Sequence, residues 1–204
     1  MKKLSSRSSQ RKAEEKSNPR AAILDATERI MLEAGYAAVS SRKVATRAGL
    51  RSQLLHYYFR TMDDLFIAVF QRLEDQHDEH FARAAASDHP IRELWKLSMN
   101  PASTGLVLEF TALATHRKAI RALIERSARR DRSMHVAAIT GIMGRGGIGA
   151  QDLSPAVGLS PTVLALLMAS VARTLVTESA LGVSDGHAEM LAFVERQLRR
   201  MESR

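Results

Sequence analysis

Apolar residues recur along the chain at intervals of three and four positions, and no segment of any length alternates apolar with polar residues. This spacing places apolar side chains on one face of an α-helix, whereas a half-buried strand needs a period of two. The pattern therefore predicts an all-α protein. Glycines, prolines and N-capping residues divide the chain into segments, and each segment is expected to form one helix.

Three helices and the start of a fourth are predicted in the first third of the chain. The first runs over 19–34, with Asn18 as its N-cap and a proline at its first position. Two short helices follow: one begins at Ser40 or Ser41 and ends at Gly49, and the other runs over about 51–58. The fourth begins at Thr61, which is followed three residues later by an aspartate, the spacing of a reciprocal capping box.

The two short helices are joined across Gly49, and this spacing predicts a helix-turn-helix. Glycine takes the positive φ angle that a tight turn between helices needs, and Ala45 is small enough for the helices to cross closely. The second helix presents side chains that can donate to phosphates and read base edges in the major groove. These side chains are Arg51, Ser52, Gln53, Leu54, His56 and Tyr57. The alternative is a solvated amphipathic helix pair.

The net charge of +8 lies entirely in the first 60 residues, which hold 13 Lys or Arg and 5 Asp or Glu. Residues 61–204 hold 17 of each sign. A basic first third joined to a neutral remainder indicates a module that binds a polyanion such as nucleic acid. The basic segment 1–17 is expected to be a disordered tail, which either solubilises the chain or adds affinity for DNA.

Residues 20–70 resemble the DNA-binding domain of the TetR family of transcriptional repressors. The resemblance is carried by Ile23, Leu24, Ala26, the "EAGY" at 33–36, the "VA..AGL" at 44–50, Leu55, Phe59 and the "DDL" at 63–65. It implies a ligand-responsive repressor that binds a palindromic operator as a homodimer and is released by a small-molecule inducer. It also implies three parts: the tail 1–17, a three-helix DNA-binding head at 18–64, and a helical ligand-binding and dimerisation domain at 65–204.

The resemblance assigns further roles by position. Arg42 matches a base contact, Ser41 a phosphate contact, and Tyr57 and Tyr58 match contacts to phosphate or sugar. The chain departs from the family pattern at two places: His56 replaces a common tyrosine, and Met62 replaces a common lysine. The lost lysine removes a phosphate contact, for which Arg60, Thr61 or the backbone amides of the fourth helix are the expected substitutes.

The remainder of the chain is divided at 87–90, 100–105, 144–155 and 181–186, which predicts about six helices after the head. Its methionines and aromatic residues are first of all core residues. In the family, the equivalent region encloses an inducer pocket. The residues assigned to that pocket are Trp95, Met99, Leu106, Glu109, Phe110, Met134 and Leu167. Glu109 is expected to pair with Arg117 or Arg121, or to face a ligand.

The helix predicted over 161–181, capped by Ser160, is apolar on all sides between 163 and 172. A helix without a polar face must be covered on more than one side. Together with the last helix it is the candidate for a four-helix dimer interface, although the last helix can also be buried within one subunit. The predicted interface residues are Leu164, Met168, Val171, Leu175, Met190, Phe193 and Val194.

Several other functions are disfavoured. The chain has no cysteine, no catalytic motif is visible, and it is expected to be neither an enzyme nor a cofactor protein. The "GRGGIG" at 144–149 follows a helix rather than a strand and is interpreted as a loop. His77 and His80, in "EDQHDEH", have a metal-binding spacing that a solvated helix face explains more simply.

The expected location is the cytoplasm, because residues 1–17 lack the apolar core of a signal peptide. The uncharged run 153–172 contains two prolines and a glycine, and is not expected to span a membrane. The alternative function is a small-molecule or metal-binding sequestering protein without a specific operator.

Overall fold

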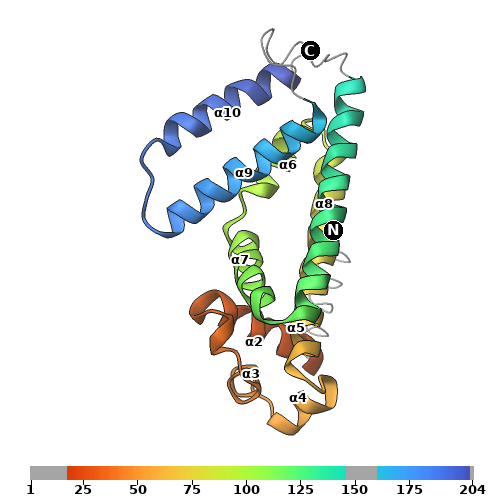
Figure 1. Cartoon of the computed structure of the whole chain (residues 1–204), viewed down its shortest axis with the longest axis vertical. Helices are drawn as coiled ribbons and strands as arrows, with labels where there is room; N and C mark the ends of the chain where they lie inside the picture. The colour runs from red at the N-terminus through yellow and green to blue at the C-terminus, as the bar shows by residue number, and fades with distance from the viewer. Residues whose placement is uncertain (1–17, 146–159, 203–204) are drawn as a thin grey trace, which may run out of the picture. The chain divides into compact units, whose positions relative to one another are not determined.

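The structure is a computed structural model that describes residues 18–145 and 160–202. These residues form helices and loops without a strand, which confirms the predicted all-α class. The predicted tail 1–17 and most of the predicted loop at 144–155 lie outside the described residues. The helices are α2 (Pro19–Ala34), η1 (Tyr36–Ala38), α3 (Ser41–Ala48), α4 (Ser52–Tyr58), α5 (Met62–Ala85), α6 (Pro90–Ser98), α7 (Pro101–His116), α8 (Lys118–Arg145), α9 (Pro161–Ala180) and α10 (His187–Glu202) (Figure 1).

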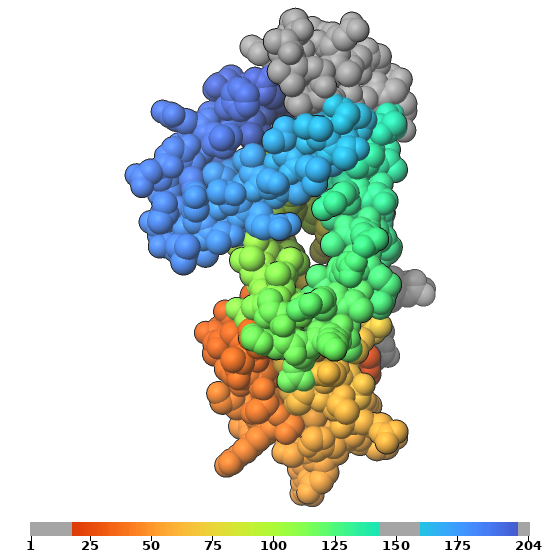
Figure 2. Space-filling view, in the orientation of Figure 1, coloured from red at the N-terminus to blue at the C-terminus, as the bar shows by residue number. Residues whose placement is uncertain are grey.

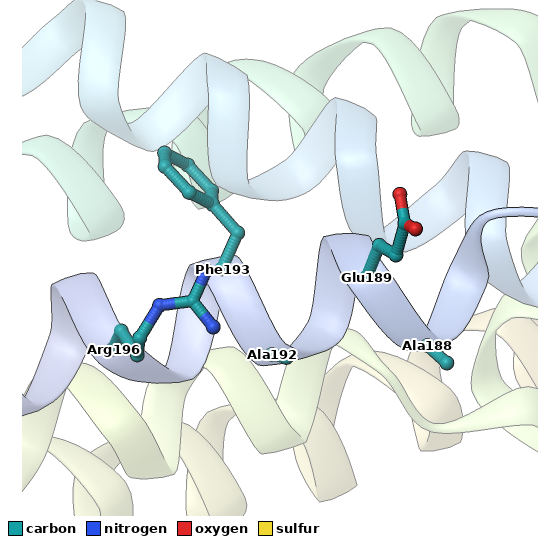
Figure 3. Close-up of a pocket in the computed structure, with 5 residues that line it drawn as sticks. All are labelled: Ala188, Glu189, Ala192, Phe193 and Arg196. Atoms are coloured by element: carbon teal, nitrogen blue, oxygen red, sulfur yellow. The ribbon is translucent and has the colours of Figure 1, made fainter.

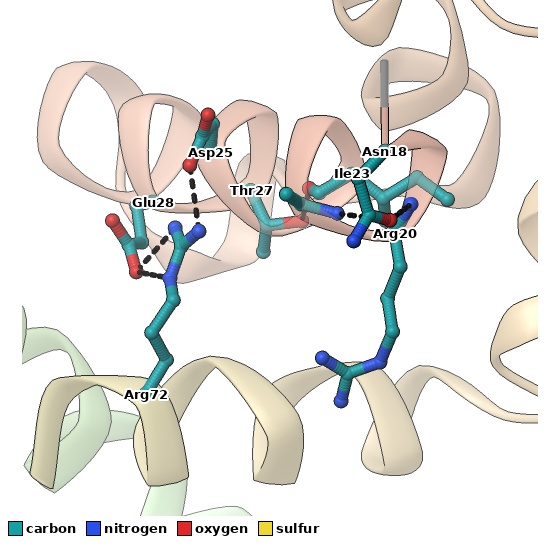
Figure 4. Close-up of polar contacts among 8 residues, drawn as sticks. Asn18, Arg20, Ile23, Asp25, Thr27, Glu28 and Arg72 are labelled. Carbon is teal, nitrogen blue, oxygen red and sulfur yellow. Dashed lines mark hydrogen bonds and ion pairs between the residues drawn. The ribbon is translucent and has the colours of Figure 1, made fainter. Parts of the chain in front are cut away.

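The ends of α2 are set by the residues that the sequence indicates. The Asn18 side chain accepts hydrogen bonds from the amides of Arg20 at 3.0 Å and Ala21 at 3.4 Å (Figure 4). These bonds satisfy two amides of the first turn, which have no partner within the helix. Gly35 ends α2 with a φ of 78°, a left-handed conformation that favours glycine.

Helices α3 and α4 form the predicted helix-turn-helix. The Ser40 hydroxyl accepts from the Lys43 amide at 3.4 Å and caps α3. Gly49 ends α3 in the left-handed region, with φ 68° and ψ 28°. The Leu50 amide donates to the Ala45 carbonyl at 2.9 Å. The turn therefore satisfies the last carbonyls of α3 with its own backbone, and α4 can begin two residues later.

The predicted capping box at the start of α5 is present. The Thr61 hydroxyl accepts from the Asp64 amide, and the Asp64 carboxylate accepts from the Thr61 amide, each at 3.0 Å. The helix then continues without interruption for 24 residues.

The chain divides into two compact units. Unit 1 comprises Met1–Leu73 with Leu106–Leu123, and unit 2 comprises Glu74–Gly105 with Ile124–Arg204. Helices α5, α7 and α8 each contribute residues to both units.

Unit 1 contains the helix-turn-helix, packed on α2. Ile23, Val44 and Leu55 are almost completely buried at the centre of these three helices. An ion-pair network joins α5 to α2: the Arg72 guanidinium donates to Asp25 at 2.6 Å and to Glu28 at 2.9 Å (Figure 4). Burial raises the pKa of Glu28 above its ordinary value, although Arg72 opposes this effect.

Unit 2 has a core built on α6, which packs against both α9 and α10. The residues buried in this core are Ile91, Trp95, Ile139, Leu164, Ala165, Met168, Ala172, Leu175 and Leu198. Val171 and Val194 are partly buried against it. Three predicted interface residues of α9, namely Leu164, Met168 and Leu175, are therefore buried against their own chain.

One predicted break between helices differs from the structure. The break predicted at 100–105 is shorter, because Asn100 caps α7 by accepting from the Ala102 amide at 3.0 Å, and the helix begins at Pro101. Helix α9 is a continuous helix of 20 residues, and by length and composition alone it could cross a membrane. Its buried face packs in the core of unit 2.

Candidate nucleic-acid interface

The first part of the candidate interface is the exposed surface of α4. Ser52, Gln53, His56 and Tyr57 are exposed on this helix, and Leu54 is half-buried. Leu55 is buried instead, because it packs beneath the turn. Since polar groups cover the outer face and one apolar residue anchors the inner face, α4 presents a donor-rich surface of the kind that reads a major groove.

Two adjacent tyrosines close the C-terminal end of α4. The rings of Tyr57 and Tyr58 lie edge to face, with their centroids 5.3 Å apart. Tyr57 is 79% exposed, the largest exposed fraction among the large hydrophobic side chains of the described residues. The contact with Tyr58 orients the Tyr57 ring, which is not buried in the core. The exposed Tyr57 hydroxyl can therefore form a hydrogen bond to a phosphate or sugar.

Four arginines lie on or near α4, and two of them contact other side chains of the protein. Arg47 pairs with Glu33, and Arg20 lies over the Phe59 ring at 5.5 Å. Arg42 and Arg51 are exposed, and neither pairs with a carboxylate in the described part of the chain. Ion pairing within the protein therefore leaves these two arginines able to neutralise phosphates.

The start of α5 offers less to a phosphate than the sequence indicates. The Thr61 and Asp64 amides are already used by the capping box, and Asp63 pairs with Arg117. Two carboxylates in the first turn also repel an anion. Of the expected substitutes for the missing lysine, the exposed Arg60 is the better placed.

Comparisons with known proteins agree with this geometry. Residues 23–69 match the family of bacterial regulatory proteins described as the tetR family. The HTH-type transcriptional regulator PksA of Bacillus subtilis (strain 168) is 31% identical over 105 residues, which are 47% of this chain and 51% of PksA. The chain matches the TetR family over its helix-turn-helix segment. It matches only about half the length of this curated relative.

Solved structures support the same fold over about nine tenths of the chain. A TetR transcription regulator from Haloarcula marismortui ATCC 43049 is similar with a TM-score of 0.65 and 19% identity, covering 92% of this chain and 94% of that one. The protein from Saccharomonospora viridis solved in complex with choline has a TM-score of 0.67 and 17% identity, covering 90% and 93%. At these identities the similarity establishes the fold alone.

The seven residues assigned to an inducer pocket are divided between the two units of the chain. Leu106 and Phe110 are buried in unit 1, where the Phe110 ring contacts Phe70 at 5.0 Å. Trp95 is buried in unit 2, and Leu167 is exposed on α9. Met99 and Met134 are partly buried against two different clusters of unit 2.

Glu109 has a partner that the sequence does not indicate. Its carboxylate accepts a hydrogen bond from the backbone amide of Tyr36 at 2.6 Å. The two arginines expected to pair with it are used elsewhere: Arg117 pairs with Asp63, and Arg121 donates to the carbonyl of Ala114 at 3.2 Å.

The histidine motif of α5 belongs to a cluster in unit 2. Asp131 on α8 lies 2.8 Å from the His77 ring and 3.3 Å from the His135 ring. Burial alone would lower the pKa of His135, but the hydrogen bond and charge of Asp131 outweigh burial and raise it. His80 is exposed, and no group of metal-ligating side chains is found among the described residues.

An open depression lies on the surface of α10 and has a volume of about 550 Å³. Figure 3 shows the five lining side chains on this helix: Ala188, Glu189, Ala192, Phe193 and Arg196. Because all of them belong to one exposed helix, the depression does not enclose a small molecule as ligand pockets do. It forms part of an exposed surface next to the apolar residues of α9.

Proposed function

We propose that this TetR-family regulator is a repressor that binds a palindromic operator as a homodimer and releases it when a small-molecule inducer binds. The observation that carries the proposal is the exposed donor set of α4, held beyond the left-handed turn at Gly49. Such a regulator works where the DNA is, and we therefore place it in the cytoplasm.

Recognition of DNA would divide between base contacts and phosphate contacts. Gln53 lies in the first turn of α4, and its amide can pair with adenine through two hydrogen bonds, as the Arg42 guanidinium can with guanine. Ser41, Tyr57 and Tyr58 would donate to the backbone, which fixes the register of the head on the duplex. The unpaired arginines would add the electrostatic, salt-sensitive part of the affinity.

Dimerisation would use the exposed face of α9 rather than its buried face. Val163, Leu166 and Leu167 are 41–46% exposed on α9, and Met190 and Phe193 are exposed on α10. The surfaces of these two helices lie together on one face of unit 2 (Figure 2). Two copies that joined these faces would form a four-helix interface with twofold symmetry. The dimer would then carry two DNA-binding heads.

The inducer would act by linkage. A ligand that binds better to a conformation with mis-spaced heads lowers DNA affinity by its differential binding energy, typically ~1–3 kcal/mol. The choline complex of the Saccharomonospora viridis protein supports a small-molecule site in this fold. We expect the site in unit 2, which holds the partly buried methionines Met99 and Met134.

The test compares the wild-type protein with the variant Ser52→Ala/Gln53→Ala/Tyr57→Ala on DNA enriched from a random library. All three side chains are exposed, so the variant should keep the helical content of the wild type. We expect it to lose on the order of 100-fold in affinity for the enriched duplex, since base and phosphate contacts each contribute about 1–3 kcal/mol. Equal affinity of the two proteins in fluorescence anisotropy would overturn the assignment of α4 as the reading element.

A further inference from the structure

Helix α7 contains one carboxylate, Glu109, and this side chain contacts the backbone of the DNA-binding head. Its Oε2 atom accepts from the amide of Tyr36 at 2.6 Å. Tyr36 opens η1, the short helix between α2 and α3, and the two residues are 73 positions apart in the sequence. Both belong to unit 1.

The local backbone leaves this amide in need of a partner. The Gly35 amide donates to the Met31 carbonyl at 3.0 Å and completes α2. The next donor, the Tyr36 amide, begins a new helix and cannot use an intrahelical carbonyl. A negatively charged acceptor at a helix N-terminus is favourable, and a bond to a charged group is shorter and stronger than a neutral one.

Gly35 lies beside this contact, and its positive φ rather than a lack of space restricts the position to glycine. A Cβ atom added at Gly35 would lie 3.5 Å from the Glu109 Oε2 atom, at a φ of 78° that disfavours other residues. The carboxylate therefore lies directly against the α2–η1 junction.

The neighbours of Glu109 are buried side chains that fix how its carboxylate is oriented on α7. Phe110 is completely buried and packs edge to face against Phe70 of α5, and Leu106 is 5% exposed. With these side chains fixed, the Glu109 carboxylate follows the backbone of α7. Hydrogen bonds weaken steeply with distance and misalignment, so an axial shift of α7 by about 1 Å is enough to break this contact.

We propose that Glu109 is the positioning residue through which α7 sets the α2–α3 junction and hence the orientation of the helix-turn-helix. Helix α7 begins in unit 2 at Pro101 and continues into unit 1 from Leu106. A change in unit 2 that shifts the first turn of α7 is transmitted along a stiff helix to Glu109 and from there to Tyr36. This role rests on the proposed DNA-binding function. It identifies the Glu109 carboxylate as the group that couples effector binding to the DNA-binding head.

The coupling is testable without an inducer, because linkage is reciprocal: DNA bound to the head must alter the far end of α7. Hydrogen exchange would be measured by mass spectrometry and NMR on the full chain, free and saturated with a duplex enriched from a random library. The segment 90–105, which covers α6 and the first turn of α7, reports transmission, and the Tyr36 amide reports the contact itself. The variants are Glu109→Ala, Glu109→Gln and the control Thr111→Ala, an exposed residue of the same helix whose hydroxyl bonds only to the Val107 carbonyl.

In the wild type and Thr111→Ala, DNA should change the exchange of 90–105. In Glu109→Ala the Tyr36 amide should exchange about tenfold faster, as expected for loss of a hydrogen bond to a charged group. The DNA-induced change in 90–105 should disappear, while 40–60 remains protected by the duplex. Glu109→Gln keeps an acceptor oxygen and should restore most of the response, which a general loss of stability would not do.

The outcomes separate the two proposals. A response of 90–105 that is the same in Glu109→Ala and the wild type overturns the role of Glu109 and leaves DNA binding intact. Wild-type protein that binds no duplex overturns the proposed function and this inference with it. If Glu109→Ala does not fold, Glu109→Gln decides: an unaltered Tyr36 exchange rate with a lost response in 90–105 would contradict the hydrogen bond as the coupling element.

Discussion

The amide of Leu50 lies 2.9 Å from the carbonyl of Ala45 and donates to it across the turn of the helix-turn-helix. This bond exists because Gly49 adopts a left-handed conformation between α3 and α4. The turn places α4 so that Leu55 is buried while Ser52, Gln53 and Tyr57 remain exposed. A single backbone conformation thus determines which side of α4 is available to DNA.

Replacing Gly49 with Ala should destabilise unit 1 by about 1 kcal/mol, the cost of placing a Cβ in the left-handed region. A Cβ at this position would meet no atom within 4 Å, so the cost is conformational and not steric. Urea unfolding followed by circular dichroism would measure it. Gly49→Asn is the matched variant, because asparagine tolerates this region, and it should recover much of the loss. Equal losses in the two variants would contradict a conformational origin.

Replacing Gln53 with Ala should relax base preference and leave nonspecific binding nearly unchanged. The side chain is exposed and makes no contact that holds the fold, so it is free to pair with a base. Discrimination between the enriched duplex and a duplex with one altered base pair should fall by roughly 5- to 100-fold. Competition anisotropy would measure it, and equal losses on all sequences would show that Gln53 does not read a base.

Replacing Leu167 with Glu should convert the proposed dimer into a monomer, because it places a charge in the apolar face of α9. The matched control is Leu32→Glu on α2, since both leucines are 46% exposed. Light scattering should give the 22.5 kDa mass of one chain for the first variant and twice that mass for the control. A dimeric Leu167→Glu protein would place the interface elsewhere.

The Asp131–His135 pair predicts how stability changes with pH. The pKa of His135 is raised in the folded chain. Its contribution to the free energy of unfolding is therefore complete below the unfolded-state pKa of about 6.5, and it is lost as the pH rises through the folded-state pKa. The pKa of Asp131 is lowered, because bonds to His135 and His77 outweigh the opposing effect of burial. The contribution of Asp131 to the free energy of unfolding is complete above the unfolded-state pKa of about 3.9, and it is lost as the pH falls through the folded-state pKa. The pair therefore stabilises most between about pH 4 and pH 6.5.

Asp131→Asn should remove this contribution, about 1 kcal/mol or less because the carboxylate is 45% exposed. The difference in unfolding free energy from the wild type should be largest between about pH 4 and pH 6.5 and should shrink as the pH rises through the raised pKa of His135. The control Asp75→Asn changes an exposed carboxylate of α5 and should show no such dependence. A constant difference across the whole range would assign Asp131 a role other than an ion pair.

Local signals in the sequence were sufficient to predict most helix boundaries. Asn18, Ser40 and Ser160 cap the helices that follow them, because their side chains satisfy amides a few residues away. The exposed residues of α4 were also predictable, since a buried leucine and a preceding glycine fix which side faces outward. Their roles in DNA binding remain predictions.

Long-range contacts and the faces of uniformly apolar helices were not predictable in the same way. Nothing near Glu109 in the sequence indicates that its partner is a backbone amide 73 residues earlier. In α9, leucine occupies both buried and exposed positions, as Leu164 and Leu167 show, so composition does not identify the face that packs on α6. Both features depend on tertiary packing, which a local pattern does not contain.

The most direct test of the central claim is selection of bound duplexes from a random DNA library by the purified protein at ~150 mM salt, where nonspecific binding is weakened. A dimeric reader of an operator predicts enrichment of an inverted repeat, and its half-site spacing gives the separation of the two heads. A pool without an enriched motif would contradict sequence-specific recognition and leave only charge-driven binding.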